Sequence, residues 1–193
     1  MQRDMDFDGR AEKYDGRMGK TSQRFYKMLL GQIETKPGDT VLDAGCGTGE
    51  VLKRLAESRE IDGYGVDISE SMVTRAKRKN PGMKIQVARS EDTPFEDDFF
   101  DVVFVCMAYH HFSDKDGFAS EAKRILKPRG RLYIADPYFP AAVRAAVNVF
   151  FRLMRVAGAI YAPQKIHEDF AAKGFTPDGF IKNGYAQLVM LKK

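Results

Sequence analysis

Short apolar runs alternate with longer amphipathic stretches along most of the 193-residue chain. The runs predicted to be strands lie at 40–44, 63–67, 84–88, 101–106 and 131–136. Between them, apolar residues recur with the 3.6-residue period of helices. Residues 101–106 are almost continuously apolar, as expected for a strand that is covered on both faces. The alternation predicts a largely parallel α/β sheet with helices on its two faces.

Both ends of the chain depart from this alternation. We expect two helices first, at 7–16 and 20–34, and two more after the fifth strand, at 140–157 and 163–173. Asn183-Gly184 then separates two short runs, which is a strong signal for a tight hairpin turn. The pattern therefore predicts that an antiparallel hairpin completes the sheet at one edge.

Composition and charge indicate a globular chain about the size of one domain. Hydrophobic residues make up 44% and charged residues 30%. Residues 141–193 hold eight basic and three acidic side chains, leaving 23 basic and 24 acidic ones elsewhere. Because most of the protein is not a polycation, a general nucleic-acid-binding role is disfavoured. We expect one domain over 1–193, with cap helices in 1–36 and a helical insertion at 138–162 that belongs to the same cap.

Several classes of protein are disfavoured by what the chain lacks. Cys46 and Cys106 are too few for a disulfide scaffold or a four-cysteine zinc site, and no His, Cys and carboxylate cluster has metal-ligand spacing. We expect no metal. The first ten residues have no signal-peptide core, and no run of 18 uncharged apolar residues exists to span a membrane. These features predict a cytoplasmic protein, and they leave monomer and homodimer open.

The glycine-rich segment after the first predicted strand carries the strongest chemical signal. Asp43 precedes Gly45, Gly47 and Gly49, and Glu50 follows them, so the spacing differs from the G-x-G-x-x-G of dinucleotide-binding loops. A carboxylate about 4 Å from a phosphate is repelled by roughly 4 kcal/mol at an effective dielectric near 20, and attracts an ammonium by a similar amount. The segment therefore favours a cofactor with a cationic end and no phosphate. S-adenosylmethionine, with its ammonium and sulfonium, fits.

Several motifs, in sequence order, carry a family resemblance. Val41 to Gly49 (VLDAGCGTG), 65–72, 100–103 and 124–128 resemble the motifs of class I S-adenosylmethionine-dependent methyltransferases. Residues 7–15 resemble the N-terminal segment of the branch that includes the ubiquinone and menaquinone C-methyltransferases. The resemblance implies a Rossmann-like, doubly wound, seven-stranded mixed sheet in the order 3-2-1-4-5-7-6, with the last strand antiparallel and a helical cap. It also implies S-adenosylhomocysteine as the product.

The loop and the resemblance together predict the cofactor site. Asp67 lies 22 residues after Gly45, at the end of the second predicted strand, where an acidic residue can accept both ribose hydroxyls. Its alternative role is to cap the helix that begins after Ser69. The predicted cofactor-binding residues are Tyr14, Asp43, Ala44, Gly45, Cys46, Gly47, Gly49, Asp67, Ile68, Met72, Ser90, Glu91, Cys106 and Met107.

Two positions depart from the family pattern. Arg89 occupies the place of a carboxylate that usually contacts the adenine amino group, so we expect Ser90, Glu91 or Asp92 to take over. The alternative is that these acidic residues form a solvated loop. After the fourth strand, Val105-Cys106 replaces a polar pair, and only backbone carbonyls remain there to meet the ammonium.

Candidates for catalysis follow the fourth and fifth strands, because ligands of open α/β sheets bind at the carboxyl ends of strands. Tyr109, His110 and His111 share one loop, and Asp136 ends the fifth strand. A histidine with a pKa near 6.5 can accept a proton from a phenol or ammonium acceptor. The alternatives are structural, with the histidines at a helix entrance and Asp136 as a helix cap.

The acceptor is expected to be a small molecule methylated at O, N or C by in-line displacement. It is partly hydrophobic if the 140–157 helix is a lid over an apolar pocket. The same helix could instead pack on the sheet, or lie on a membrane surface with its stripe of Arg144, Asn148, Arg152 and Arg155. Three rivals remain open: an RNA or protein methyltransferase that uses the basic C-terminal region, a non-catalytic S-adenosylmethionine-binding protein, and a nicotinamide oxidoreductase.

Overall fold

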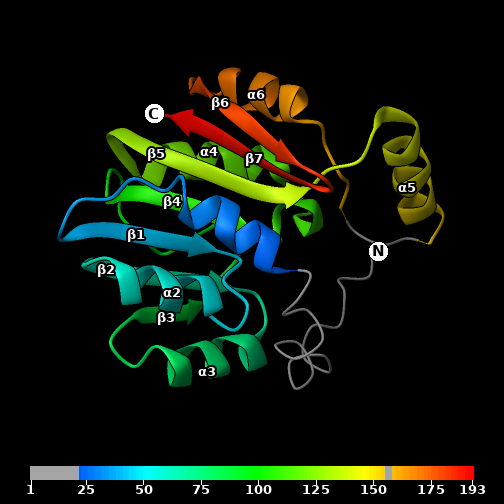
Figure 1. Ribbon diagram of the computed structural model, residues 1–193. Coiled ribbons are helices and arrows are strands. Elements are labelled where there is room, and N and C mark those ends of the chain that lie inside the picture. Colours follow the sequence, from blue (N-terminus) through cyan, green and yellow to red (C-terminus); the bar gives the residue numbers. More distant parts are fainter. Residues whose placement is uncertain (1–21, 155–157) are drawn as a thin grey trace.

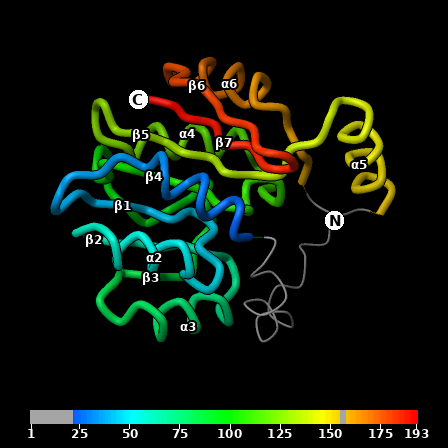
Figure 2. The backbone as a smooth tube through the Cα atoms, in the orientation of Figure 1, coloured from blue at the N-terminus to red at the C-terminus, as the bar shows by residue number. Residues whose placement is uncertain are grey.

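A seven-stranded sheet in the order β3-β2-β1-β4-β5-β7-β6 forms the centre of the computed structural model, which describes residues 22–154 and 158–193 (Figure 1). The strands are β1 (Asp39–Ala44), β2 (Ile61–Asp67), β3 (Lys84–Val87), β4 (Phe100–Cys106), β5 (Leu126–Pro137), β6 (Thr176–Asn183) and β7 (Ala186–Lys192). β1 to β5 run parallel, whereas β7 is antiparallel to both of its neighbours. Figure 2 traces the final hairpin, in which β7 returns between β5 and β6. The predicted Rossmann-like topology is confirmed.

Helices cover both faces of the sheet. They are an unlabelled helix over 22–30, α2 (Glu50–Ser58), α3 (Glu70–Lys79), the short 3-10 turn η2 (Tyr109–His111), α4 (Lys115–Ile125), α5 (Ala141–Leu153) and α6 (Pro163–Ala171). Helix 22–30, α2 and α3 share one hydrophobic core with the sheet, and α4 and α6 share the other. α5 stands apart from both layers, beyond the carboxyl ends of the parallel strands (Figure 1).

Strand β4 shows how the continuous apolar run is used. Val103 and Val105 pack in the core beneath α4 and α6, whereas Val102 and Phe104 pack in the core on the opposite face. Successive side chains of a strand point to opposite faces, so each face of a central strand needs its own apolar set. The run at 101–106 is thus fully explained by burial on both faces.

Several element boundaries differ from the prediction. The fifth strand begins at Leu126, not at residue 131, because Phe100 pairs with Leu126 and the register then shifts so that Val102 pairs with Arg131. Residues 127–130 span this irregularity in β5. Their polar, Pro-containing sequence does not follow the apolar pattern of a strand, so the pattern did not predict that the strand begins at Leu126. The helix predicted at 20–34 ends at residue 30, and its start lies outside the described residues. The helices predicted at 140–157 and 163–173 are shorter in the structure, at Ala141–Leu153 and Pro163–Ala171.

The predicted N-terminal cap is only partly described. Helix 22–30 buries Phe25 and Leu29 against the sheet. The predicted helix at 7–16, with Tyr14, lies outside the described residues.

Candidate functional site

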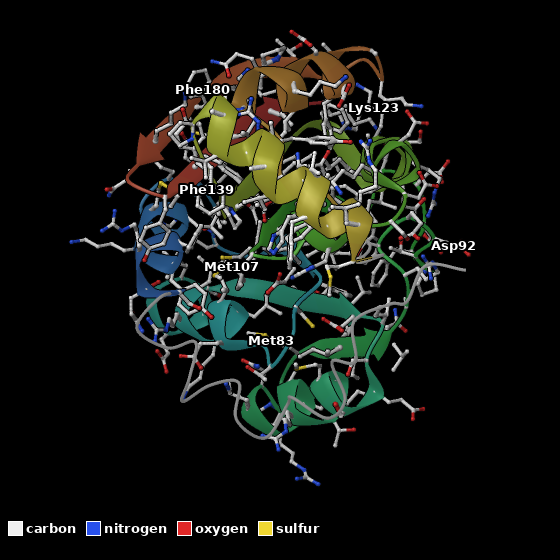
Figure 3. The ribbon with its side chains drawn as sticks, turned by 90° about the vertical axis from the view of Figure 1, so that its right-hand side faces the viewer. Met83, Asp92, Met107, Lys123, Phe139 and Phe180 are labelled. Carbon is white, nitrogen blue, oxygen red and sulfur yellow. The ribbon has the colours of Figure 1, made fainter. Side chains whose placement is uncertain are left out.

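A cavity opens at the carboxyl ends of β1, β2 and β4, with an empty volume of about 1120 Å³ including the space open to solvent. Eleven of the residues predicted to bind cofactor line it: Asp43, Gly45, Cys46, Gly47, Asp67, Ile68, Met72, Ser90, Glu91, Cys106 and Met107. Figure 3 looks onto this edge of the sheet, with Met107 labelled near its centre.

The glycine loop is held in a conformation that glycine favours. Gly45, Gly47 and Gly49 all have positive φ, at 79°, 50° and 72°. A Cβ on Gly45 would lie 2.6 Å from the Ala108 Cβ, and one on Gly49 would lie 2.5 Å from the Asn80 Nδ2. A Cβ on Gly47 would meet no atom within 4 Å. Packing therefore requires the outer two glycines, whereas the middle one, which lines the cavity, has open space at the position of a Cβ.

Asp67, at the end of β2, ties the loop to the next helix. Its Oδ2 accepts the Gly47 N–H at 2.8 Å and its Oδ1 accepts the Ser69 N–H at 3.0 Å. The cap of α3 is Ser69, whose Oγ accepts the Met72 N–H at 3.2 Å, so Asp67 is not the helix cap. A carboxylate oxygen can accept more than one hydrogen bond. Asp67 thus presents a fixed pair of acceptors to the cavity.

Asp43, at the end of β1, is a buried acid in the cavity wall. Its side chain is 1% exposed, and among the described residues its Oδ1 has no hydrogen-bond partner. Burial, followed by the negative charge of Asp67, raises the pKa of Asp43 well above its usual range. A buried carboxylate without a counter-ion is unfavourable. The cavity therefore suits a ligand that brings a positive charge to this wall.

Glu50 makes a smaller electrostatic contribution than its place in the sequence suggests. Its carboxylate accepts hydrogen bonds from Arg54 at 2.8 Å and from Lys79 at 2.9 Å. Although desolvation opposes ionisation, these bonds lower the pKa of Glu50. Since both cations neutralise it, the preference for a cationic ligand rests on Asp43 and Asp67.

The wall formed after β3 combines an ion pair with apolar side chains. Arg89 donates from Nε to Glu91 Oε1 at 2.7 Å, and both residues line the cavity. The acidic loop is therefore not simply solvated at Glu91, and Asp92 is absent from the described cavity wall. Ile68 and Met72 line the cavity too, and Ile68 is half-exposed. This wall suits a flat, partly apolar ring.

Both cysteines are poor nucleophiles. Burial is the largest cause that raises the pKa of the Cys46 and Cys106 thiols well above their usual range. Thiol reactivity depends on the thiolate. Cys46 and Cys106 therefore serve as small apolar parts of the wall.

Two of the predicted cofactor-binding residues lie elsewhere, and a third is not described. Ala44, the last residue of β1, is buried in the hydrophobic core. Gly49 directly precedes α2 and packs against α3. Neither belongs to the described wall of the cavity. Tyr14 lies outside the described residues.

The four predicted catalytic residues separate into three environments. His111 lines the cavity. His110 lies behind it, with the two imidazole centroids 3.8 Å apart, and His110 Nδ1 is 2.8 Å from Asp136 Oδ1. Asp136 is fully buried and does not cap α5, whose N-cap is Pro140. The cap alternative for Asp136 is therefore wrong.

Tyr109 belongs to the hydrophobic core. It is 1% exposed, and its ring contacts Phe112, Phe118 and Phe170. Burial raises the pKa of its phenol well above the usual range. Tyr109 is not among the residues that line the cavity, although its ring packs against Phe112, which is one of them.

Sequence reasoning missed Tyr26, which lines the cavity from helix 22–30. Arg54 lies over the Tyr26 ring at 5.1 Å from its centroid. Nothing in the helical pattern distinguishes Tyr26 from an ordinary surface aromatic, because its position depends on how the helix crosses the sheet. Arg89 and Ser113 also line the cavity. Arg89 Nη2 donates a hydrogen bond to Ser113 Oγ at 3.0 Å.

Lys115 is a partly buried cation close to these residues. Its Nζ donates to the Phe112 carbonyl at 2.8 Å and lies 5.3 Å from the ring centroids of Tyr109 and Tyr161. Desolvation lowers the pKa of Lys115 to about 8, against an opposing effect of Asp136. The unfolded chain thus binds this proton more tightly than the folded protein, so the folded state gains stability as the pH rises from about 8 to 10.5.

We predict that Lys115→Met removes this gain. The wild-type free energy of unfolding should rise by roughly 2–3 kcal/mol relative to that of Lys115→Met between pH 8 and 10.5. Urea unfolding at a series of pH values measures the difference. Lys53→Met, at an exposed position on α2, is the control and should follow the wild type. Parallel curves for wild type and Lys115→Met would contradict the predicted shift.

Comparison with known proteins identifies the family. Residues 42–134 match the family described as a methyltransferase domain. A ubiquinone/menaquinone biosynthesis C-methyltransferase from Cupriavidus metallidurans is 33% identical over 136 residues, which cover 65% of this chain and 56% of that protein. These matches support a class I S-adenosylmethionine-dependent methyltransferase. A demethylmenaquinone methyltransferase from Thermotoga maritima is 33% identical over 155 residues, covering 75% of this chain and 65% of the relative.

Other relatives of this chain differ in the acceptor that their names state. The 27-O-demethylrifamycin SV methyltransferase of Amycolatopsis mediterranei is 32% identical over 61% of this chain and 45% of its own length. The chain spans between about a third and two thirds of the length of the first such relatives. The resemblance to the quinone C-methyltransferase branch is confirmed.

Solved structures share the fold of this chain. A putative methyltransferase in complex with the Haloferax volcanii Trm112 activator has a TM-score of 0.86 and 23% identity, and the alignment covers 98% of each chain. A geranyl diphosphate methyltransferase in complex with S-adenosylmethionine has a TM-score of 0.75 and 16% identity, covering 95% of this chain and 90% of the other. At these identities the similarity supports the fold.

Proposed function

We propose that this protein binds S-adenosylmethionine in the cavity at the ends of β1, β2 and β4 and transfers its methyl group to a small molecule. The buried Asp43 carboxylate, with an unpartnered oxygen among the described residues, carries the proposal, because it needs a cationic ligand. Gly47 leaves space beside it, and Asp67 is fixed to accept hydroxyls. These residues fit the ammonium and ribose of the family's cofactor.

Each part of the cavity wall has a proposed role in binding. Asp43 attracts the ammonium group, Asp67 accepts the ribose hydroxyls, and Ile68 and Met72 cover the adenine. Ser90, which is buried in the wall, lies on the adenine side. Arg89 holds Glu91 by an ion pair and so limits its freedom to accept from the adenine amino group.

The bound cofactor supplies an activated methyl group on a positively charged sulfur. With so good a leaving group, the protein contributes mainly alignment and the exclusion of water. An acceptor that starts as a phenol or ammonium must also lose a proton. We propose His111 as the group that receives it, because His111 alone among the predicted catalytic residues reaches the described cavity wall.

His110 and Asp136 are proposed as positioning residues. Asp136 fixes the His110 ring through the 2.8 Å contact to Nδ1, and His110 packs against His111. A carboxylate on one ring nitrogen sets the tautomer of an imidazole. Asp136→Asn should therefore shift the pH profile of methyl transfer rather than abolish cofactor binding.

The domain arrangement also enters as a proposal. Residues 1–193 form one methyltransferase domain, and helix 22–30 contributes to a cap through Tyr26. None of the described α5 residues lines the cavity, so the structure gives no support to α5 as a lid.

Binding and turnover experiments test the function directly. Calorimetry should detect S-adenosylhomocysteine binding and little binding of NADH. Incubation with methyl-labelled S-adenosylmethionine and a panel of quinols, phenols and amines should then transfer label to one class of acceptor. Preferential NADH binding would overturn the cofactor assignment. Tight S-adenosylhomocysteine binding with no transfer to any acceptor would favour the non-catalytic alternative, and labelling of RNA or protein the macromolecular one.

The glycine loop offers a paired prediction. Gly47→Ala should weaken S-adenosylhomocysteine binding at least tenfold, because its new methyl group enters the cavity, and should cost only the roughly 1–2 kcal/mol of a positive φ. Gly45→Ala should destabilise the protein by a further ~1–3 kcal/mol, because its methyl group overlaps Ala108. Urea unfolding and calorimetry separate the two effects. Equal affinity losses in the two folded variants would show that Gly47 does not face the ligand.

A further inference from the structure

The polar side of α5 is turned toward the rest of the protein. Asn148 Nδ2 donates to the Ile160 carbonyl at 2.9 Å, and Asn148 Oδ1 accepts the Ile160 N–H at 2.9 Å. Arg144, one turn earlier on the same side, donates to the Phe139 carbonyl at 3.1 Å. Two residues of the polar stripe, Arg144 and Asn148, therefore anchor the helix to the chain around it.

The apolar side of α5 is turned outward. None of its residues is buried. Val143, Val149, Phe150, Leu153 and the adjacent Met154 are between 47% and 76% exposed. Surface helices of globular proteins normally bury the apolar stripe, and large exposed apolar patches mark contact surfaces. α5 presents such a surface along its whole length.

The charges around this surface have one sign. No acidic residue occurs from Pro137 to His167, whereas Arg144, Arg152, Arg155 and Lys165 fall in that segment. A self-paired interface would bring each of these cations toward its own copy, which is unfavourable. An apolar helix face flanked by cations instead matches the boundary between acyl chains and anionic headgroups.

The dimensions of α5 fit a helix that lies on a bilayer. Its 13 residues correspond to about 20 Å, short of the roughly 30 Å of a hydrocarbon core. Across residues 22–154 and 158–193, no helix is long and apolar enough to cross a membrane. Exposed Phe and Leu side chains can still insert to about 5–10 Å, the depth reached by interfacial helices.

α5 also lies on the side of the molecule where the cavity is found. Figures 1 and 3 show it beyond the carboxyl ends of the parallel strands, and in Figure 3 it crosses the view above the labelled Met107. The segment that follows it is tied to η2, because the Ala159 N–H donates to the His110 carbonyl at 3.0 Å. Contact through α5 would thus bring the cavity side of the protein toward the contacted surface.

We propose that α5 docks this protein on an anionic membrane surface, with Val149, Phe150 and Leu153 inserted at the level of the headgroups. Arg152, at the exposed edge of the apolar face, pairs with anionic headgroups. This proposal does not depend on methyl transfer or on the identity of the acceptor.

A single introduced tryptophan tests the docking, because the chain contains none. The emission of Leu153→Trp should shift to the blue on mixing with vesicles of phosphatidylcholine and about 30% phosphatidylglycerol. Vesicles of phosphatidylcholine alone should give a smaller shift, and added salt should reduce binding to the anionic ones. Val87→Trp, at an exposed position on the edge strand β3, is the matched control and should show no shift.

Co-sedimentation with the same vesicles provides a second measurement. Phe150→Ser combined with Leu153→Ser should lower partitioning into anionic vesicles at least tenfold, and Arg152→Gln should lower it severalfold. Lys53→Gln, on α2, should not. The double variant should keep the wild-type affinity for S-adenosylhomocysteine, which shows that the fold is intact. If it does not fold, the emission of Leu153→Trp decides alone.

Three results would overturn the proposal. One is an unchanged Leu153→Trp emission with anionic vesicles. Another is equal sedimentation of wild type and a folded double variant. The third is a blue shift that grows with protein concentration when no vesicles are present, which would show that a second copy covers α5. A wild-type protein that does not bind S-adenosylhomocysteine would contradict the proposed function. It would not change what the vesicle experiments show about docking through α5.

Discussion

Asp43→Asn is expected to weaken S-adenosylhomocysteine binding by at least 100-fold while raising the free energy of unfolding of the ligand-free protein. An amide keeps the shape of the side chain but cannot balance an ammonium. A 100-fold loss corresponds to about 2.7 kcal/mol, within the range for a hydrogen bond to a charged group. The gain in stability follows because the substitution removes a buried carboxylate that lacks a counter-ion.

The pH dependence of stability tests the same residue. Since the folded-state pKa of Asp43 is raised, its contribution to stability is fully present below the unfolded pKa of about 3.9. That contribution is lost as the pH rises through the higher folded pKa. The wild-type free energy of unfolding should therefore fall relative to that of Asp43→Asn across this interval. Urea unfolding at a series of pH values measures it.

Proton release gives an independent measurement. A cationic ligand requires ionised Asp43, so binding at a pH near the raised pKa should release a proton. Calorimetry in two buffers with different ionisation enthalpies detects it, and Asp43→Asn should abolish it. Asp62→Asn, at a half-exposed site on β2, is the control and should behave as wild type. Unchanged affinity in Asp43→Asn would show that this carboxylate does not meet the ligand.

Asp67→Ala is expected to weaken S-adenosylhomocysteine binding by at least 100-fold for a different reason. The substitution removes the acceptors for two ribose hydroxyls and frees the Gly47 N–H from its anchor. Charge-assisted hydrogen bonds contribute about 1.5–3 kcal/mol each. Asp92→Ala, which changes an acid outside the described cavity wall, is the matched control and should keep the wild-type affinity.

A truncated ligand separates the two aspartates. 5′-Methylthioadenosine keeps the ribose and adenine but lacks the amino-acid part. Its affinity should fall in Asp67→Ala and stay unchanged in Asp43→Asn. The opposite pattern, or a loss in both variants, would contradict the assigned orientation of the cofactor. Asp67→Ala should also lower the pKa of Asp43, because a neighbouring negative charge is removed.

The topology and the cofactor loop could be predicted from the sequence because they depend on local rules. Apolar runs of strand length locate β1 to β4, and Asn183-Gly184 marks the hairpin of β6 and β7. The spacing of Gly45, Gly47 and Gly49 predicts a sharp backbone turn. In the structure all three residues have a positive φ, which glycine adopts readily.

The remaining features depend on contacts between distant segments. His110 and Asp136 are 26 positions apart, and no local pattern indicates that their side chains meet. Tyr109 sits beside two histidines in the sequence, yet its ring turns into the core beneath α4 and α6. The sequence of α5 shows a broad apolar arc, but the bonds of Asn148 to Ile160 decide which side faces outward.

The buried acid at the end of β1 has a consequence beyond catalysis. A ligand that binds only the folded state stabilises it by an amount that grows with the logarithm of ligand concentration. Because a cationic ligand stabilises the ionised form of this buried acid, empty molecules should melt earlier and be degraded by cellular proteases sooner than occupied ones. The steady-state abundance of this protein in a cell should therefore follow the supply of its methyl donor.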